Sequence, residues 1–256
     1  MFKNLIVVAA LAIPAVASAQ TPRVQQTHAA ADFTALTARL EKAALGDDAQ
    51  GVKDARIECM RLLAAAPAGP KAAIVRYTIV YAGWRLAYSA KIPAAEQNAL
   101  IADAEEQLGQ AITLDGSFAE AYGLRSSVYG ARISKNPELA MTLGPAAGEA
   151  LGYAISLEPN SPRLVMMQGL NLLHTPAEYG GDVKQAEAAL RRALELFDKD
   201  RAGTAWPNWG RVDAHLWLGQ VLAERGDIEG ARAEYKAALA LAPDSSRVKS
   251  LLAALK

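Results

Sequence analysis

The chain has 256 residues, with 27 basic residues balanced by 27 acidic residues, and it contains one cysteine. Zero net charge excludes the strong basic excess by which proteins bind nucleic-acid phosphates or anionic membranes, and one cysteine excludes an intramolecular disulfide framework. Alanine makes up roughly a fifth of the residues. Because alanine is the best helix former and packs closely, this composition favours closely packed helices.

The N-terminal segment MFKNLIVVAALAIPAVASAQ has the layout of a cleavable secretory signal peptide. A positive charge at Lys3 precedes an uncharged apolar run, and Ala17 and Ala19 are the small residues that a signal peptidase reads. The apolar run is too short to span a bilayer comfortably. The sequence therefore predicts a signal peptide at residues 1–19, cleaved after Ala19, and a periplasmic or secreted protein.

The rest of the chain is predicted to be helical. Residues 20–30 are polar and lack periodicity, so we expect a flexible tail there, followed by a single domain at 31–256. Periodicity and boundary signals predict a series of helices in that domain, and no segment alternates long enough to need a sheet. The expected helices are 31–45, 51–65, 71–90, 94–114, 117–133, 137–157 (broken near Gly144 and Pro145), 161–174, 182–197, 209–225, 228–241 and 245–255.

Several of these helices are preceded by a side chain suited to N-capping. Asn136 and Ser161 stand directly before a proline, which favours the first helical position, and Asp182 and Asp227 stand directly after a glycine. Such side chains accept hydrogen bonds from the free amides of the first helical turn. They therefore indicate helix starts independently of hydrophobic periodicity.

Aromatic residues gather on one face of the helix expected at 71–90. Tyr77, Tyr81, Trp84 and Tyr88 follow one another at offsets of four, three and four residues, which places them on one helical face. Aromatic stripes at helical spacing usually pack inward, so this one could be core between hairpins. It could instead line a concave groove, and the sequence leaves both interpretations open.

The groove interpretation extends to the helix expected at 117–133. There, two tyrosines seven residues apart flank an arginine, and another arginine directly follows Trp84. Aromatic faces and guanidinium groups together could hold an extended peptide or a carboxylate. The candidate groove residues are Trp84, Arg85, Tyr88, Tyr122, Arg125 and Tyr129.

Two more tryptophans, Trp206 and Trp209, flank Pro207 before the helix expected at 209–225. Large indoles in a connecting segment either fill the end of a hairpin or stay exposed as binding anchors. Trp209 stands about one turn before an apolar run, as in a hydrophobic staple. We therefore favour the filling role over the anchor role.

The clearest repeat runs from Val212 to Asp244. Small, large and turn-forming residues occupy characteristic positions of a 34-residue unit, namely Leu218, Gly219, Leu222, Gly226, Ala231, Tyr235, Ala238 and Pro243. This pattern resembles the tetratricopeptide repeat, a helical hairpin that stacks into a superhelix. The resemblance implies close approach of the two helices at Gly219 and Ala231 and a turn at Gly226.

The second-helix signature of this repeat recurs along the chain as an alanine, a larger side chain, a small or apolar residue and a turn residue. The leading alanines are Ala55, Ala104, Ala147, Ala186 and Ala231, at spacings of 49, 43, 39 and 45 residues. These spacings exceed the usual period of about 34 residues, so the units are irregular. The resemblance thus implies an all-α, right-handed superhelix of about five hairpins, with a C-terminal capping helix.

No motif for a reaction stands out. The sequence lacks a phosphate-binding glycine loop, an HExxH zinc pair, a nucleophile elbow and a CxxC pair. His174 and His215 have no carboxylates at metal-ligand spacing, so we interpret them as packing histidines, and Cys59 as a buried small hydrophobe. The sequence therefore predicts no catalytic residue, no metal site and no cofactor.

A narrower resemblance bears on function. The stretch 162–244, with its segments TPAEYGGDVKQAEAALRRALELF and AWPNWGRVDAHLWLG, resembles exported bacterial tetratricopeptide proteins, including the small periplasmic component of some TRAP-type transporters. We predict a non-catalytic exported scaffold that binds a protein or peptide partner in the concave groove of the superhelix. The alternative is a small-molecule-binding accessory component of a TRAP-type uptake system. A nucleic-acid partner and a transmembrane segment in the mature chain are not expected.

Overall fold

The structure is a computed structural model that describes residues 23–66, 68–199 and 206–255. Within these ranges it contains eleven α-helices, two short 3-10 helices and no strand, so the predicted all-α fold is confirmed. The α-helices are α1 (Arg23–Leu45), α2 (Ala49–Ala65), α3 (Pro70–Ala87), α4 (Ala94–Leu114), α5 (Ala119–Lys135), α6 (Ala140–Leu157), α7 (Pro162–His174), α8 (Val183–Lys199), α9 (Arg211–Glu224), α10 (Ile228–Leu241) and α11 (Ser246–Ala254). The 3-10 helices are η1 (Pro137–Leu139) and η2 (Ala177–Tyr179).

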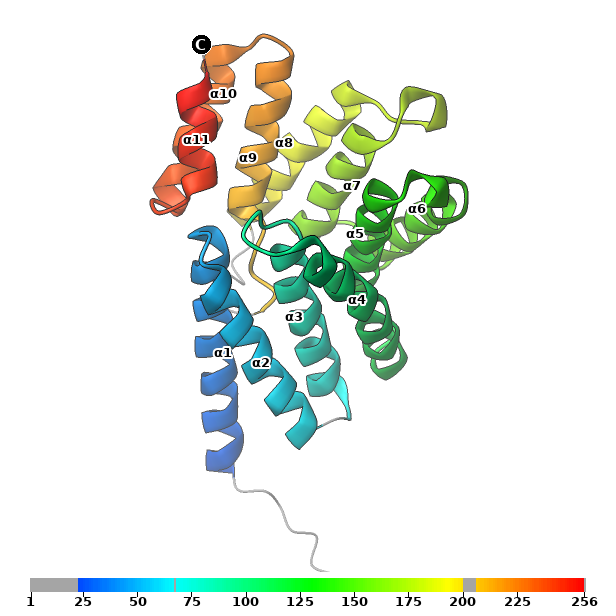
Figure 1. The fold of residues 1–256 in the computed structure, drawn as a ribbon, viewed down its shortest axis with the longest axis vertical. Helices are drawn as coiled ribbons and strands as arrows, with labels where there is room; N and C mark the ends of the chain where they lie inside the picture. The colour runs from blue at the N-terminus through cyan, green and yellow to red at the C-terminus, as the bar shows by residue number, and fades with distance from the viewer. Residues whose placement is uncertain (1–22, 67, 200–205, 256) are drawn as a thin grey trace, which may run out of the picture.

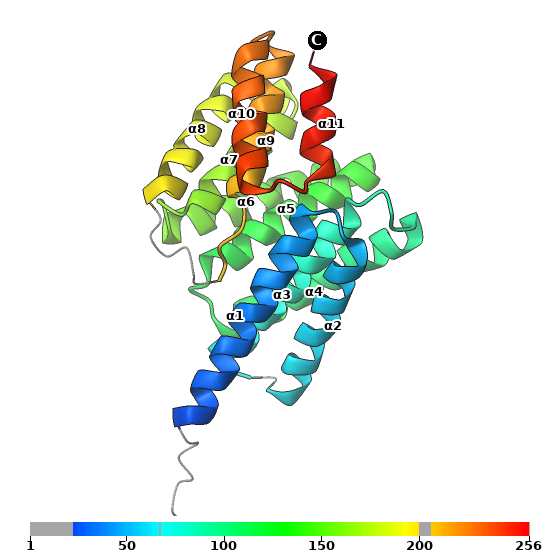
Figure 2. The same ribbon diagram turned by 90° about the vertical axis from the view of Figure 1, so that its left-hand side faces the viewer.

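Consecutive helices pack as hairpins, in the pairs α1–α2, α3–α4, α5–α6, α7–α8 and α9–α10, and α11 follows as a last single helix. Figures 1 and 2 show the hairpins stacked along a curved path, which brings α11 to a position above the end of α1. The predicted stack of about five hairpins with a terminal helix is confirmed. Its curvature creates a concave face on which residues far apart in the sequence meet.

The sequence predicts a signal peptide at residues 1–19 and a flexible tail at residues 20–30. The predicted signal peptide at 1–19 lies outside the described residues. Helix α1 begins at Arg23, inside the stretch 20–30 for which the sequence suggests a flexible tail. Neither proline nor glycine occurs between Pro22 and Gly46, so no residue type in that stretch interrupts the helix.

The predicted N-caps are confirmed at Asn136, Ser161, Asp182 and Asp227. Each side-chain oxygen accepts a hydrogen bond from a backbone N–H two or three residues further along the chain. These bonds satisfy amides that have no partner inside their own helix. Local polar chemistry therefore sets the start of several hairpin helices.

The break expected near Gly144 and Pro145 is a wrong prediction. Helix α6 runs without interruption from Ala140 to Leu157 and contains Pro145. Proline lacks an N–H, so it removes one intrahelical hydrogen bond near the start of the helix. Burial of the α6 side chains Ala147, Leu151 and Ala154 stabilises the helix in spite of that loss.

Close packing inside the hairpins depends on small residues, as expected at Gly219. A Cβ atom at this position would lie 2.5 Å from the ring of Tyr235, closer than van der Waals contact allows. The same holds between hairpins at Gly123, where a Cβ would lie 2.3 Å from Leu164. Glycine is therefore required where helices of this stack approach each other most closely.

The segment before α9, residues 206–210, crosses the concave face and packs against α3 (Figure 1). Trp209 is 1% exposed, its ring centroid lies 4.8 Å from that of Tyr81, and its indole N–H donates a hydrogen bond to the Tyr77 hydroxyl at 2.8 Å. Trp206 contacts Tyr81 edge-on at 5.3 Å. The filling role predicted for these indoles is confirmed for Trp209, and we call residues 206–210 the plug segment.

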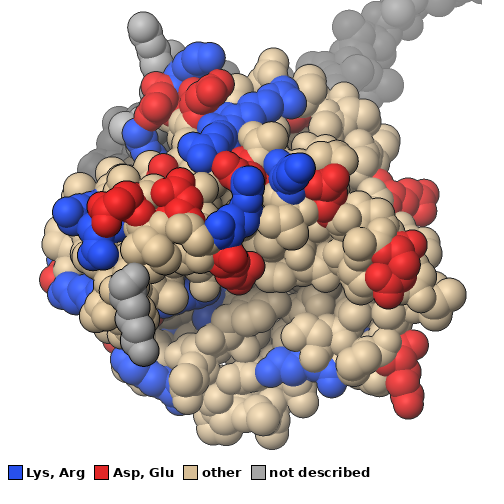
Figure 3. Space-filling view, turned by 90° about the horizontal axis from the view of Figure 1, so that it is seen from above, with Lys and Arg blue, Asp and Glu red and all other residues tan. Residues whose placement is uncertain are grey.

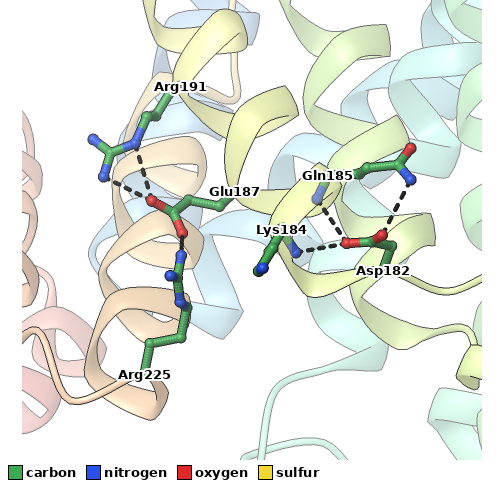
Figure 4. A network of polar contacts seen from close by, with 6 residues as sticks. All are labelled: Asp182, Lys184, Gln185, Glu187, Arg191 and Arg225. Atoms are coloured by element: carbon green, nitrogen blue, oxygen red, sulfur yellow. Dashed lines mark hydrogen bonds and ion pairs between the residues drawn. The ribbon is translucent and has the colours of Figure 1, made fainter.

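The outer surface between the last two hairpins is linked by ion pairs. Glu187 of α8 accepts hydrogen bonds from Arg191, one turn further on, and from Arg225 at the end of α9 (Figure 4). Hydrogen bonds from these two guanidinium groups hold the pKa of the Glu187 carboxyl below its usual value. Since the pairs are solvent-exposed, each contributes less than about 1 kcal/mol.

None of the described helices combines the length with the apolar character that a membrane-spanning helix needs. The apolar residues are instead collected between the helices, in a main core that extends over most of the hairpins and a smaller cluster around α9, α10 and α11. Leu45, at the end of α1, packs against the smaller cluster. The two ends of the superhelix are therefore in contact.

The plug segment yields a stability prediction. Replacing Trp209→Ala removes a fully buried indole and the hydrogen bond to Tyr77, so we expect a loss of about 3–5 kcal/mol in the free energy of unfolding. Urea denaturation followed by circular dichroism measures it. Tyr179→Ala is the control, because this side chain is 67% exposed, and its change should stay within about 0.5 kcal/mol. A Trp209→Ala loss as small as that of the control would contradict the filling role.

Candidate binding pocket

The concave face encloses a cavity of about 1050 Å³. Its walls come from the ends of α1, α3 and α7, the second half of α5, the first half of α6, and the starts of α9 and α11. Viewed from above, the molecule is hollowed, and mostly uncharged residues surround the hollow (Figure 3). Every hairpin thus contributes to the wall of this cavity.

Small residues on two neighbouring helices leave the space open. Gly130 of α5 and Gly144 and Gly148 of α6 line the cavity, and a Cβ atom added at any of the three would have no neighbour within 4 Å. Larger apolar side chains, among them Trp84 and Trp217, line other parts of the wall. The result is a predominantly apolar space, which is typical of small-molecule sites.

A contact between the two ends of the superhelix closes one side of the cavity. The Asp47 carboxylate, in the turn between α1 and α2, accepts hydrogen bonds from the Ser246 hydroxyl and from the backbone N–H of Arg247 at 3.2 Å. Asp47 has a left-handed backbone conformation with φ of 56°, which aspartate tolerates better than most residues. The first hairpin and α11 are therefore joined through one carboxylate.

The plug segment packs behind one residue of the cavity wall. Trp84, which lines the cavity, packs against Trp209 with ring centroids 5.8 Å apart. Trp209 in turn lies against Tyr81, deeper in the core. The Trp209 indole therefore supports the wall residue Trp84 from the core side, without being part of the cavity lining itself.

The structure brings together the first part of the candidate groove. Trp84 and Arg85 of α3 and Tyr88, which directly follows this helix, all line the cavity, and Tyr88 is 56% exposed. In contrast, Tyr77 and Tyr81 from the same helical face are fully buried. The aromatic stripe thus contributes to the core at one end and to the pocket wall at the other, so each of the two interpretations describes part of it.

The second part of the candidate groove lies elsewhere on α5. Tyr122 packs edge-on against Tyr153 of α6 at 4.8 Å, and the Arg125 guanidinium donates a hydrogen bond to the Tyr129 hydroxyl at 2.8 Å. None of these α5 side chains is part of the cavity lining, to which the same helix contributes Ser126 and other small residues. A ligand-binding role for Tyr122, Arg125 and Tyr129 stays a prediction.

Arg85 is engaged within the protein. Its guanidinium forms an ion pair with the Asp213 carboxylate of α9 at 2.7 Å, and both side chains are largely buried. Burial opposes the charge of Arg85, but Asp213, Tyr81 and Glu41 outweigh this effect and raise the pKa of Arg85. Because Arg85 is held by this pair, it joins α3 to α9, and its charge is already compensated.

A further carboxyl group lies next to this pair. Glu41 of α1 accepts a hydrogen bond from the Tyr81 hydroxyl. Burial raises the pKa of the Glu41 carboxyl, and the nearby Asp213 carboxylate raises it further, against the opposing effects of Arg85 and of the Tyr81 hydrogen bond. Burial, together with the nearby Asp213 carboxylate, thus favours the protonated form of Glu41.

Residues from the C-terminal half form an aromatic and cationic corner that the groove prediction did not include. His174 of α7 meets the Trp217 ring edge-on at 5.2 Å, and the Arg247 guanidinium lies over the same ring at 5.4 Å. All three residues line the cavity. Burial lowers the pKa of His174, opposed by Glu224, which favours the neutral imidazole at neutral pH. Trp217 and Arg247 are 30 residues apart, so no local pattern could reveal their contact.

Cys59 and His215, which lie outside the pocket, are each engaged in packing or pairing within the protein. Within the described ranges, no group of three or more His, Cys, Asp or Glu side chains could hold a metal ion. Cys59 is buried, and burial raises the pKa of its thiol to about 12, which makes it unreactive. His215 pairs with Glu234 at 2.7 Å across the last hairpin. The pocket is therefore the candidate site that we consider further.

Comparison with known proteins supports the fold. The tetratricopeptide repeat family matches residues 180–255. The HusA haemophore from Porphyromonas gingivalis has a similar structure, with a TM-score of 0.58 and 27% identity over 73% of this chain and 92% of that chain. A thermophilic tetratricopeptide protein from Thermus thermophilus has a TM-score of 0.59 and 20% identity over 82% of this chain and 91% of its own. No curated protein matches the chain.

The C-terminal part of the chain, residues 180–255, therefore matches the tetratricopeptide repeat family, and the chain as a whole has the fold of a tetratricopeptide protein. The matched residues include the segment 212–244, in which the repeat pattern is clearest, and the Thermus structure shows the same fold. Proteins of this superfamily use the concave face of the superhelix for binding and generally serve as scaffolds for protein interaction. They are typically non-enzymatic.

The buried group of Arg85, Asp213 and Glu41 leads to a prediction about how the stability of the protein depends on pH. Because the folded-state pKa of Glu41 is raised, the native state holds this proton more tightly than the unfolded chain does. The contribution of the protonated Glu41 carboxyl to the stability of the fold is complete at a pH below the pKa that Glu41 has in the unfolded chain. This contribution is lost as the pH rises through the pKa that Glu41 has in the folded protein. Glu41→Gln stays neutral, so its stability relative to the wild type should increase as the pH rises from about 4 to about 8. Urea denaturation across this range tests the sign, and a flat or falling difference would contradict it.

Proposed function

We propose that this protein is a non-enzymatic, exported binding protein that holds an apolar ligand in the cavity of its concave face. The observation that supports this most directly is the enclosure of about 1050 Å³ by all the hairpins. This volume lies near the upper end of the range of small-molecule pockets, about 300–1000 Å³. Export is supported by the signal-peptide layout of residues 1–19.

The shape of the concave face supports a compact ligand over a long peptide. An extended peptide needs a continuous groove, but the plug segment occupies part of this face, and the contact of Asp47 with α11 closes another part. The remaining pocket is lined by aromatic rings and small residues, and it can surround an apolar molecule on several sides. The similarity to a haemophore agrees with this proposal, since that neighbour is named as a carrier of haem.

A protein or peptide partner is the second candidate, favoured by the superfamily whose fold the chain has. In that case, a short apolar segment of the partner would insert into the same pocket, and the rest of the partner would contact the surrounding helix ends. An accessory role in an uptake system, which the sequence resemblance suggests, fits either candidate. The pocket is the shared element of all these roles, so it is the feature to test first.

A matched pair of glycines on α6 allows that test. Gly148 lines the pocket and Gly152, one turn further on, does not, and a Cβ atom at either position meets nothing within 4 Å. Gly148→Phe should fill the pocket without disturbing the fold, and Gly152→Phe should leave the pocket unchanged. We expect Gly148→Phe to weaken binding of the apolar fluorescent probe N-phenyl-1-naphthylamine by about tenfold or more, which corresponds to about 1.4 kcal/mol.

Fluorescence titration measures the affinity, and melting temperatures confirm that both variants fold. If Gly148→Phe and Gly152→Phe bind the probe as well as the wild type does, the cavity is not the site, and the proposal fails. The protein-partner candidate is tested with the same variants by crosslinking in the native compartment. It predicts a defined partner that the wild type and Gly152→Phe capture and that Gly148→Phe loses.

A further inference from the structure

We propose that the ligand of the pocket is an amphiphilic anion, whose apolar body fills the cavity and whose carboxylate binds Arg247 beside Trp217. This inference rests on the proposed function and specifies the ligand that the pocket selects. It follows from the charged residues in the wall, which are Asp47, Asp48, Arg85, Asp213 and Arg247. Four of them have a hydrogen-bond or ion-pair partner within the protein, whereas the guanidinium of Arg247 has no carboxylate partner among the described residues.

The acidic residues of the wall all have structural partners. Asp47 accepts hydrogen bonds from α11, and Asp48 caps α2 by accepting from the backbone N–H of Gly51 at 3.0 Å. Asp213 is paired with Arg85 at 2.7 Å. Neutral donors therefore hold the Asp47 and Asp48 carboxylates in place, and the Arg85 guanidinium has Asp213 as its counter-charge.

Arg247 is the exception among the charged residues of the wall. Its backbone N–H binds Asp47, but no carboxylate of the described residues lies within ion-pair distance of its guanidinium, which rests over the Trp217 ring at 5.4 Å. A guanidinium that stacks on an aromatic face keeps its N–H edge free for a bidentate carboxylate. Arg247 is thus a positioned cation without a counter-charge at the border of an apolar space.

The surroundings of Arg247 favour an anion with an apolar body. His174 also contacts Trp217, and burial lowers the pKa of its imidazole, which disfavours a second cation beside the apolar wall. Trp217 continues the apolar wall inward from the guanidinium. A ligand that reaches Arg247 with a carboxylate therefore places the adjoining part of its body along Trp217 and the remainder in the cavity.

Binding of such an anion would also stabilise the contact between α11 and the first hairpin at one side of the pocket. Arg247 belongs to α11, which touches the first hairpin through Asp47. A ligand held both by Arg247 and by the walls on α1 and α2 adds contacts across this junction. The anion should therefore stabilise the closed arrangement as well as occupy the space, and ligand binding should raise the melting temperature.

A pair of probes that differ only in charge tests the inference. We would titrate 1-pyrenebutanoate and uncharged 1-pyrenebutanol into the wild type, Arg247→Leu, Arg247→Lys and the control Arg232→Leu, following pyrene fluorescence. Arg232 lies on α10, is not part of the cavity wall and carries the same charge as Arg247. The full chain is used throughout, and melting temperatures verify folding.

We expect the wild type to prefer the carboxylate, and Arg247→Leu to weaken binding of the carboxylate by about tenfold or more, with binding of the alcohol changed less than about twofold. Arg247→Lys should retain part of the preference, and Arg232→Leu all of it. Equal affinity of the wild type for both probes would overturn the inference, and so would an equal loss of both in Arg247→Leu. If the wild type binds neither probe and also fails to bind N-phenyl-1-naphthylamine, the proposed function falls together with the inference.

Discussion

The insertion of Trp209 into the aromatic face of α3 is the interaction on which the shape of the molecule depends. The indole is fully buried against Tyr81 and Trp84, and it donates a hydrogen bond to Tyr77, 132 residues earlier in the chain. A tetratricopeptide superhelix is otherwise held mainly by contacts between neighbouring hairpins. Here the plug segment joins the start of α9, the first helix of the fifth hairpin, directly to α3. The Arg85–Asp213 ion pair reinforces this connection between α9 and α3.

This long-range connection determines what the concave face can bind. The plug segment supports Trp84 from the core side and Asp47 meets α11, and between these contacts the concave surface forms a partly open pocket. The pocket stays open because Gly130, Gly144 and Gly148 project no side chains into it. An ordinary repeat scaffold with an extended groove is thus converted into a scaffold suited to a compact ligand, and the uncompensated Arg247 indicates the charge of that ligand.

Most of the fold could be predicted from the sequence, because local chemistry determines it. The repeat pattern in 212–244 and the N-caps such as Ser161 and Asp227 depend on residues close to each other in the chain, and the structure confirms them. The expected break near Pro145 was wrong because burial of Ala147, Leu151 and Ala154 stabilises α6 in spite of the hydrogen bond that proline cannot make. The general role of Trp209 was predictable from its position before an apolar run, but its contact with α3 was not.

The candidate site was only partly predictable, because it depends on the curvature of the whole stack. Trp84, Arg85 and Tyr88 were found through their spacing on one helix, and all three line the pocket. Helical spacing alone could not show that Arg85 is neutralised by Asp213, 128 residues away. Nor could it show that Trp217 and Arg247 meet, since the position of α11 is set by tertiary packing.

The central claim is that the superhelix closes on itself around one ligand pocket. The most direct measurement is a crystal structure of the full-length protein purified from its native compartment without denaturation. The account predicts that α11 contacts Asp47, that Trp209 is buried against α3, and that electron density for an apolar molecule fills the cavity, with its charged end at Arg247. A superhelix with α11 separated from Asp47 and a continuous open groove would contradict it.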